Sequence, residues 1–261
     1  MNQMNNMKKY ADLALQKGIN LQKGQALVVS ASVENADLVR LIGKRAYELG
    51  AKEVHVNWRD GVLTQLKFKH APLEIFEDFP DWYAQAQVDY AKKGAGFLTI
   101  TGDDPQLLNG ISSEKIAANN RSSSLKMKEL RKYTMGNFNS WCIIAAPTIG
   151  WAEALYDDAV EEEEKIDRLG TAIFKANRVD QADPIAAWEN HLSLLAEKVD
   201  LLNAKQYRRF VITSDNGTSL DIRLPNHHIW WGGGEENKQG TYFVANMPTE
   251  EVFTAPDKTG D

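Results

Sequence analysis

The 261-residue sequence has few of the features that mark secreted, membrane-spanning or nucleic-acid-binding proteins. A single cysteine, Cys142, cannot form a disulfide within the chain, so a buried, reduced thiol is expected. The polar segment 1–9 lacks the apolar core of a signal peptide, and no run approaches the roughly 18 apolar residues that cross a bilayer. The net charge of −6 weighs against nucleic-acid and anionic-membrane partners. We therefore expect a cytoplasmic protein with no nucleic-acid and no membrane partner.

Motifs of several enzyme classes are also absent. The sequence contains no GxxxxGK[ST] phosphate-binding loop and no HExxH pair. The short run Gly94-Ala95-Gly96 precedes a predicted strand, which argues against a dinucleotide site. All five histidines are interpreted as structural: His55, His70, His191, His227 and His228. The adjacent His227 and His228 would point to opposite faces of a strand, so they would chelate a metal poorly.

The first two thirds of the chain alternate strand and helix patterns. Apolar, β-branched runs predict four strands: 26–31, 53–58, 97–101 and 141–146. Helical spacing of apolar residues predicts three helices: 7–16, 34–48 and 81–93. Gly18 and Gly50 are expected to end the first two of these helices in the left-handed conformation. The alternation predicts an α/β fold with a mostly parallel sheet that is flanked by helices.

Two longer helices are predicted after these elements. The first, at 158–175, opens with the acidic run 161–164, which we interpret as a solvated helix start that suits the helix dipole. The second begins at Asp183-Pro184 and carries an apolar packing face. Beyond it, Asn216-Gly217 joins two strand-like runs and predicts a hairpin. We therefore predict an α/β domain over residues 1–204 and the beginning of a smaller, β-containing domain over residues 205–261.

Charged residues provide candidate sites of unequal strength. Asp103 and Asp104 follow a predicted strand, where ligands gather in open α/β sheets. Because Asp104 precedes Pro105 as an N-cap residue does, we favour a capping role. A basic cluster on a helix-like stretch is interpreted as a solvated face: Arg121, Lys126, Lys128, Arg131 and Lys132.

The segment 246–256 is the strongest candidate. It reads Asn-Met-Pro-Thr-Glu-Glu-Val-Phe-Thr-Ala-Pro and places adjacent carboxylates, Glu250 and Glu251, between a turn and an apolar run. In a strand these two side chains would point to opposite faces, so one of them would face a given pocket. Carboxylate oxygen suits Zn²⁺, Co²⁺ or Mn²⁺ in a mixed oxygen and nitrogen site.

This segment resembles the signature of the thermophilic metallo-aminopeptidase family, which includes aminopeptidase T, aminopeptidase S and PepS. Residues 178–188, Arg-Val-Asp-Gln-Ala-Asp-Pro-Ile-Ala-Ala-Trp, are similar to a second stretch of that family. The resemblance covers essentially the whole chain. It implies a metal-dependent aminopeptidase that acts on peptides with a free N-terminus, uses two divalent ions (Co, Zn or Mn) and forms a homodimer. By its position in the motif, Glu251 matches the first metal ligand of the family, with Glu250 as the fallback.

The resemblance also implies that this chain is the N-terminal portion of such an enzyme. The other metal ligands and the general base would come from a portion beyond Asp261, so residues 205–261 would be the truncated beginning of a catalytic domain. Two close ions lower the pKa of a bound water and polarise the scissile carbonyl, which one carboxylate cannot achieve. Two alternatives are a non-catalytic α/β module for dimerisation or partner binding, and an unrelated nucleotide-binding α/β protein.

Overall fold

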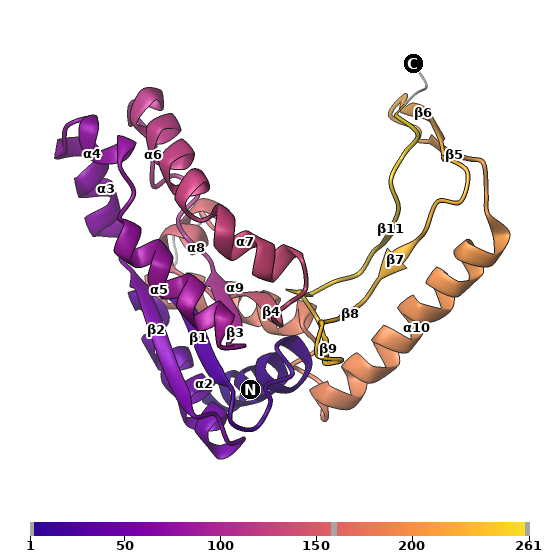
Figure 1. The fold of residues 1–261 in the computed structure, drawn as a ribbon, viewed down its shortest axis with the longest axis horizontal. Coiled ribbons are helices and arrows are strands. Elements are labelled where there is room, and N and C mark those ends of the chain that lie inside the picture. The colour runs from indigo at the N-terminus through magenta and orange to yellow at the C-terminus, as the bar shows by residue number, and fades with distance from the viewer. Residues whose placement is uncertain (1–2, 158–160, 259–261) are drawn as a thin grey trace. The chain divides into compact units, whose positions relative to one another are not determined.

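The structure is a computed structural model that describes residues 3–157 and 161–258 (Figure 1). Its α-helices are α1 (Gln3–Leu13), α2 (Ala36–Glu48), α3 (Gly61–His70), α4 (Glu74–Glu77), α5 (Asp81–Lys92), α6 (Ser113–Lys126), α7 (Lys128–Met135), α8 (Ile149–Leu155), α9 (Glu162–Ala176) and α10 (Pro184–Lys205). A π-helical segment, η1 (Ala14–Gly18), follows α1, and a 3₁₀ segment, η2 (Val33–Asn35), precedes α2.

The strands fall into one larger sheet and three small ones. The larger sheet contains β1 (Ala26–Ser32), β2 (Glu53–Arg59), β3 (Gly96–Thr101), β4 (Trp141–Ala145) and β10 (Asn246–Met247). The small sheets pair β5 (Arg209–Thr213) with β6 (Ser219–Arg223), β7 (Trp231–Gly232) with β11 (Val252–Phe253), and β8 (Glu235–Glu236) with β9 (Tyr242–Phe243). All three small sheets are antiparallel.

The chain divides by its internal contacts into two compact units. Unit 1 comprises Met1–Ile185 and Glu235–Pro248, and unit 2 comprises Ala186–Gly234 and Thr249–Asp261. Residues 235–248 therefore belong with the first unit, although they follow α10 in the sequence. The domain boundary between residues 204 and 205 stays a prediction.

The larger sheet lies in unit 1 and has the order β10-β4-β3-β1-β2, and each pairing in it is parallel. The α/β prediction is confirmed, because the four predicted strands form four of its five members. In the central register, Leu27 of β1 lies between Val54 of β2 and Gly96 of β3. The fifth strand, β10, comes from the segment 246–256 and was not predicted.

Burial explains why β1 is central and β2 lies at the edge. β1 reads Ala-Leu-Val-Val-Ser-Ala-Ser and is buried along almost its whole length, as a parallel strand covered on both faces must be. β2 is largely half-exposed and begins with a charged residue, as suits an edge. Helix α2 contacts β1, β2 and α1, while α5 contacts α7 (Figure 1). Right-handed crossovers to strands on either side of β1 place α2 and α5 on opposite faces of the sheet.

The first predicted helix cap is wrong and the second is correct. Gly50 has a φ of 95° after α2, which is the left-handed conformation expected of it. Gly18 is buried at the end of η1 and is not among the residues with positive φ. A Cβ atom at Gly18 would lie 2.8 Å from Sγ of Cys142. Close packing against β4 therefore accounts for this glycine.

The remaining helices follow the predicted patterns with some differences. Helix α9 begins at Glu162 and the glutamates at its start are exposed, as expected; residues 158–160 of the predicted helix lie outside the described residues. α3 was not predicted, and Val62 and Leu63 in its first turn are exposed rather than periodic and buried. Among the described residues, no helix has the length and apolar character needed to cross a membrane.

Unit 2 combines most of helix α10 with two small antiparallel sheets. Trp188 and Leu195 are buried members of the packing face that was predicted for α10. β5 and β6 form the predicted hairpin, and Gly217 in its turn has a φ of 90°. Every residue of β5 is exposed.

Candidate functional site

The segment 246–256 passes from unit 1 into unit 2 between Pro248 and Thr249. Its first two residues form β10, and its later residues form β11, which pairs with β7. In that antiparallel pairing Phe253 lies opposite Trp231. The two glutamates lie in the irregular stretch immediately before β11. The assumption that they alternate across a strand is therefore wrong, because the strand begins only at Val252.

Gly232 of β7 allows this stretch to lie close to its neighbour. A Cβ atom at this position would lie 2.7 Å from Cγ1 of Val252 and 3.0 Å from the carbonyl oxygen of Glu251. Both distances are too short for an ordinary contact, so a side chain here would displace the backbone beside the glutamates. Gly232, the first glycine of the run after Trp231, thus has a local structural reason.

The two glutamates differ in what their carboxylates contact. The carboxylate of Glu251 accepts a hydrogen bond from the backbone N–H of Glu250, with Oε2 3.0 Å from the nitrogen. The carboxylate of Glu250 lies 3.4 Å from Nε2 of His191, and its side chain is 54% exposed. Both residues are exposed to solvent. The pair therefore presents two anionic groups at the surface of unit 2, each with a defined neighbour.

His191 of α10 is the residue that sequence reasoning missed. Its side chain is only 10% exposed, and Nε2 lies 2.7 Å from the carbonyl oxygen of Thr249. The ring also packs edge-on against Trp188 of the same helix, with centroids 5.6 Å apart. A sequence signal existed, because Trp188 and His191 are three residues apart and so share a helix face. Nothing in the sequence placed that face beside residue 249.

The carboxylates of Glu250 and Glu251 and the imidazole of His191 are of the types that bind divalent ions, but they are too few to hold two of them. Carboxylate oxygen and imidazole nitrogen are ligands of Zn²⁺ and Co²⁺, and bound ions are usually held by three or four protein groups. Within residues 3–157 and 161–258, no three His, Cys, Asp or Glu side chains cluster closely enough to hold a metal ion. These residues therefore do not by themselves fit a pair of divalent ions.

The aspartates after β3 have structural roles. Oδ1 of Asp104 accepts a hydrogen bond from the N–H of Gln106 at 2.7 Å, so this side chain caps a turn. The capping interpretation is correct in kind, although the next helix, α6, begins only at Ser113. Asp103 lies 3.7 Å from the guanidinium of Arg59 at the end of β2.

Two other histidines, His228 and His55, and the cysteine also have structural surroundings. The Nδ1 atom of His228 lies 3.0 Å from the carbonyl oxygen of Pro225, and the residue is buried. His55 stacks on Tyr90. Cys142 is buried in β4, as expected, and burial raises the pKa of its thiol. Burial and the raised pKa both disfavour the thiolate, which is the form of cysteine that acts as a nucleophile.

The predicted basic cluster is solvated. Helix α7, which carries Lys128, Arg131 and Lys132, contains no buried residue. Lys126, at the end of α6, is paired with Asp81 at 2.5 Å. The interpretation as a solvated face is confirmed.

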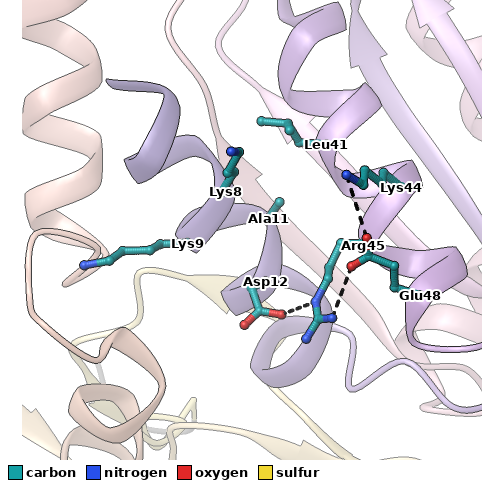
Figure 2. Close-up of a pocket in the computed structure, with 8 residues that line it drawn as sticks. All are labelled: Lys8, Lys9, Ala11, Asp12, Leu41, Lys44, Arg45 and Glu48. Atoms are coloured by element: carbon teal, nitrogen blue, oxygen red, sulfur yellow. Dashed lines mark hydrogen bonds and ion pairs between the residues drawn. The ribbon is translucent and has the colours of Figure 1, made fainter. Parts of the chain in front are cut away.

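Figure 2 shows a surface pocket of about 420 Å³ in unit 1, between α1 and α2. Four of its charged side chains are paired with one another: Asp12, Lys44, Arg45 and Glu48. The guanidinium of Arg45 lies 2.6 Å from Asp12 and 3.3 Å from Glu48, and Lys44 lies 4.0 Å from Glu48. Because both carboxylates of this pocket bind Arg45, they are poor candidates for holding a metal ion.

Comparison with known proteins places almost the whole chain in one family. The sequence model of a family described as thermophilic metalloprotease (M29) matches residues 3–260. Aminopeptidase AmpS of Bacillus subtilis (strain 168) is 45% identical over 251 residues, which are 96% of this chain and 61% of AmpS. Aminopeptidase 2 of Geobacillus stearothermophilus is 44% identical over 252 residues, which are 97% of this chain and 60% of that protein.

A solved structure has the same fold. Wild-type AmpT from Thermus thermophilus superposes with a TM-score of 0.89 at 35% sequence identity. The match covers 96% of this chain and 61% of the AmpT chain. The chain thus spans about three fifths of the length of the relatives that it matches.

Proposed function

Because the chain belongs to the thermophilic metalloprotease family (M29), we propose that it forms part of a metal-dependent aminopeptidase that releases N-terminal amino acids from peptides. The names of its relatives support this activity. The observation that carries the proposal is the oriented carboxylate of Glu251, which is exposed yet held at 3.0 Å by the N–H of Glu250. Ligating carboxylates are commonly fixed in this way by a hydrogen bond.

We propose Glu251 as a ligand of the first of two divalent ions, with Glu250 as the fallback. Two such ions (Co²⁺, Zn²⁺ or Mn²⁺) would supply a water of lowered pKa and a polarised peptide carbonyl. The remaining ligands and the general base are proposed to lie outside these 261 residues.

The setting of the proposed enzyme rests on sequence evidence. The reduced, buried Cys142 supports a cytoplasmic location. A homodimer is proposed from the family resemblance alone. The substrate class is a peptide with a free N-terminus.

The test is to substitute each glutamate in a protein that carries these 261 residues together with the remaining two fifths of the family length. Glu251→Ala should lower the turnover of leucine p-nitroanilide with added Co²⁺ or Zn²⁺ by at least about 100-fold, because a metal ligand is lost. Glu197→Ala, which removes an exposed carboxylate from α10, is the matched control and should retain parent turnover.

The comparison of Glu251→Ala with Glu250→Ala assigns the ligand. A large loss in Glu250→Ala with parent turnover in Glu251→Ala would transfer the role to the fallback. Parent turnover in both variants would refute the proposed site.

We also propose that the 261 residues alone lack significant aminopeptidase activity. The check is to remove metal, add back Co²⁺ or Zn²⁺, and follow both leucine release and bound metal. Turnover that rises with metal to about two ions per chain would contradict this proposal.

A further inference from the structure

We infer that His191 is a positioning residue that orients the carboxylate of Glu251 through the peptide group between Thr249 and Glu250. Its significance for catalysis rests on the proposed function, whereas the geometry that carries it does not. All the residues involved belong to unit 2.

The first step concerns the imidazole itself. Its side chain is only 10% exposed, and it packs edge-on against Trp188, which is fully buried. An edge-to-face contact of two aromatic rings favours one ring orientation. The direction of the Nε2 atom is therefore set by α10 and not by solvent.

The second step concerns the proton on Nε2. This nitrogen lies 2.7 Å from the carbonyl oxygen of Thr249. Because a carbonyl oxygen can only accept, Nε2 carries the hydrogen and donates it. Thr249 is 8% exposed, so loss of this donor would leave its carbonyl poorly solvated.

The third step concerns the peptide group. The carbonyl of Thr249 and the N–H of Glu250 belong to one planar unit and point in opposite directions. The N–H of Glu250 donates to Oε2 of Glu251 at 3.0 Å. Fixing the carbonyl therefore fixes the direction of the N–H, and with it the carboxylate of Glu251. Polarised hydrogen bonds in series also strengthen one another.

We call these two hydrogen bonds, from Nε2 of His191 to the carbonyl of Thr249 and from the N–H of Glu250 to Oε2 of Glu251, the relay. The relay gives the two glutamates different functions. Glu251 accepts the hydrogen bond at the end of the relay, while Glu250 lies 3.4 Å from Nε2 at its beginning. A carboxylate that accepts through one oxygen keeps the lone pairs of the other. The arrangement thus favours Glu251 over Glu250 as the oriented ligand.

The experiment measures hydrogen exchange at the Glu250 amide in the metal-free, 261-residue chain. His191→Phe keeps an aromatic ring against Trp188 but removes the donor, so exchange at this amide should be about tenfold faster. His191→Gln places an amide nitrogen at the position of Nε2 and should restore exchange to within about threefold of the parent. His55→Phe makes the same chemical change in β2 of unit 1 and should have no effect at Glu250.

A second set of variants tests the coupling. Glu251→Ala removes the acceptor and should also accelerate exchange at Glu250. Combined with His191→Phe, it should give much less than the product of the two single effects. If His191→Phe does not fold, His191→Asn replaces it, because its amide nitrogen is one bond too short to reach the carbonyl.

The inference would be overturned if His191→Phe or His191→Asn folds and the hydrogen exchange rate of the Glu250 amide stays within twofold of the parent. Equal acceleration in His191→Gln and His191→Phe would do the same, because it would show that the ring and not the donor matters. Neither measurement involves metal or substrate. The relay and the proposed function, which is tested by turnover of Glu251→Ala, can therefore fail independently.

Discussion

The two compact units hold their strands in contrasting surroundings. In unit 1, β1 has a hydrogen-bonded neighbour on each side, and all of its residues except Ser30 are buried. In unit 2, β5 has one neighbour and each of its residues is exposed. Burial therefore stabilises β1 of unit 1, whereas pairing and turn geometry must hold the hairpin of unit 2. A two-stranded hairpin is at best marginally stable by itself.

The candidate site lies in the less buried of the two units. Glu250, Glu251 and His191 all belong to unit 2. We therefore expect substitutions in unit 1 chiefly to lower the free energy of unfolding, and substitutions in unit 2 chiefly to change the local geometry. Matched substitutions in the two units test this expectation.

The largest effect is expected from the matched pair Val29→Ala and Val211→Ala. Val29 of β1 is fully buried, and its truncation should lower the free energy of unfolding by about 2–3 kcal/mol. Val211 of β5 is 56% exposed, so its truncation should cost no more than about 0.5 kcal/mol. Urea denaturation measures both. If both substitutions lower the free energy of unfolding equally, β5 is buried in solution and the two units do not differ in burial.

A smaller loss is expected from filling the close contact at Gly18. Gly18→Ala places a methyl group 2.8 Å from Sγ of Cys142 and 3.2 Å from Sδ of Met247. Overpacking of this kind should lower the free energy of unfolding by about 1–2 kcal/mol.

A double variant provides the control for this prediction. Cys142→Ala removes the sulfur, so Gly18→Ala should cost clearly less in that background. Additive costs would show that the contact with β4 is not the reason for the glycine.

Gly232→Ala makes the equivalent change in unit 2. The new methyl group would lie 2.7 Å from Val252, about as close as the contact at Gly18. Because β7 and β11 are short and contain no buried residue, we expect the strands to separate at a cost below about 1 kcal/mol. Hydrogen exchange of Val252 should nevertheless accelerate. A loss as large as that of Gly18→Ala would mean that unit 2 unfolds together with unit 1.

The sequence predicted four strands of the larger sheet because each is long enough to carry an apolar, β-branched pattern. The run at 26–31 is one residue shorter than β1, and the run at 97–101 likewise differs from β3 by one residue. β10 was missed because two residues carry no periodicity, and their pairing partner, β4, is remote in the chain.

Only part of the candidate site could be predicted, because contacts between residues that are remote in the chain leave no local sequence pattern. Motif resemblance identified Glu250 and Glu251, because the signal lies in consecutive residues. His191 acts through a contact with Thr249, which is 58 positions away. A single sequence specifies such a contact only through the fold, so the imidazole was interpreted as one structural histidine among several.

The smallest difference between the two units is expected from matched surface ion pairs, Asp12 with Arg45 in unit 1 and Asp221 with Arg209 in unit 2. Asp12→Asn should lower the free energy of unfolding by about 1 kcal/mol, because Arg45 joins α1 to α2 and its side chain is 36% exposed. Asp221→Asn should cost no more than about 0.5 kcal/mol. The carboxylate of Asp221 contacts two guanidinium nitrogens, which favours a stronger pair.

Solvent exposure nevertheless weakens the ion pair between Arg209 and Asp221. The side chains of Arg209 and Asp221 are 62% and 51% exposed, so solvent screens the pair. Opening of an exposed hairpin is also not coupled to loss of the core. Urea denaturation at low salt and in about 1 M NaCl should show the cost of Asp12→Asn falling with salt. A larger cost for Asp221→Asn than for Asp12→Asn would show that the hairpin contributes to the cooperative fold and that the two units do not differ as their burial indicates.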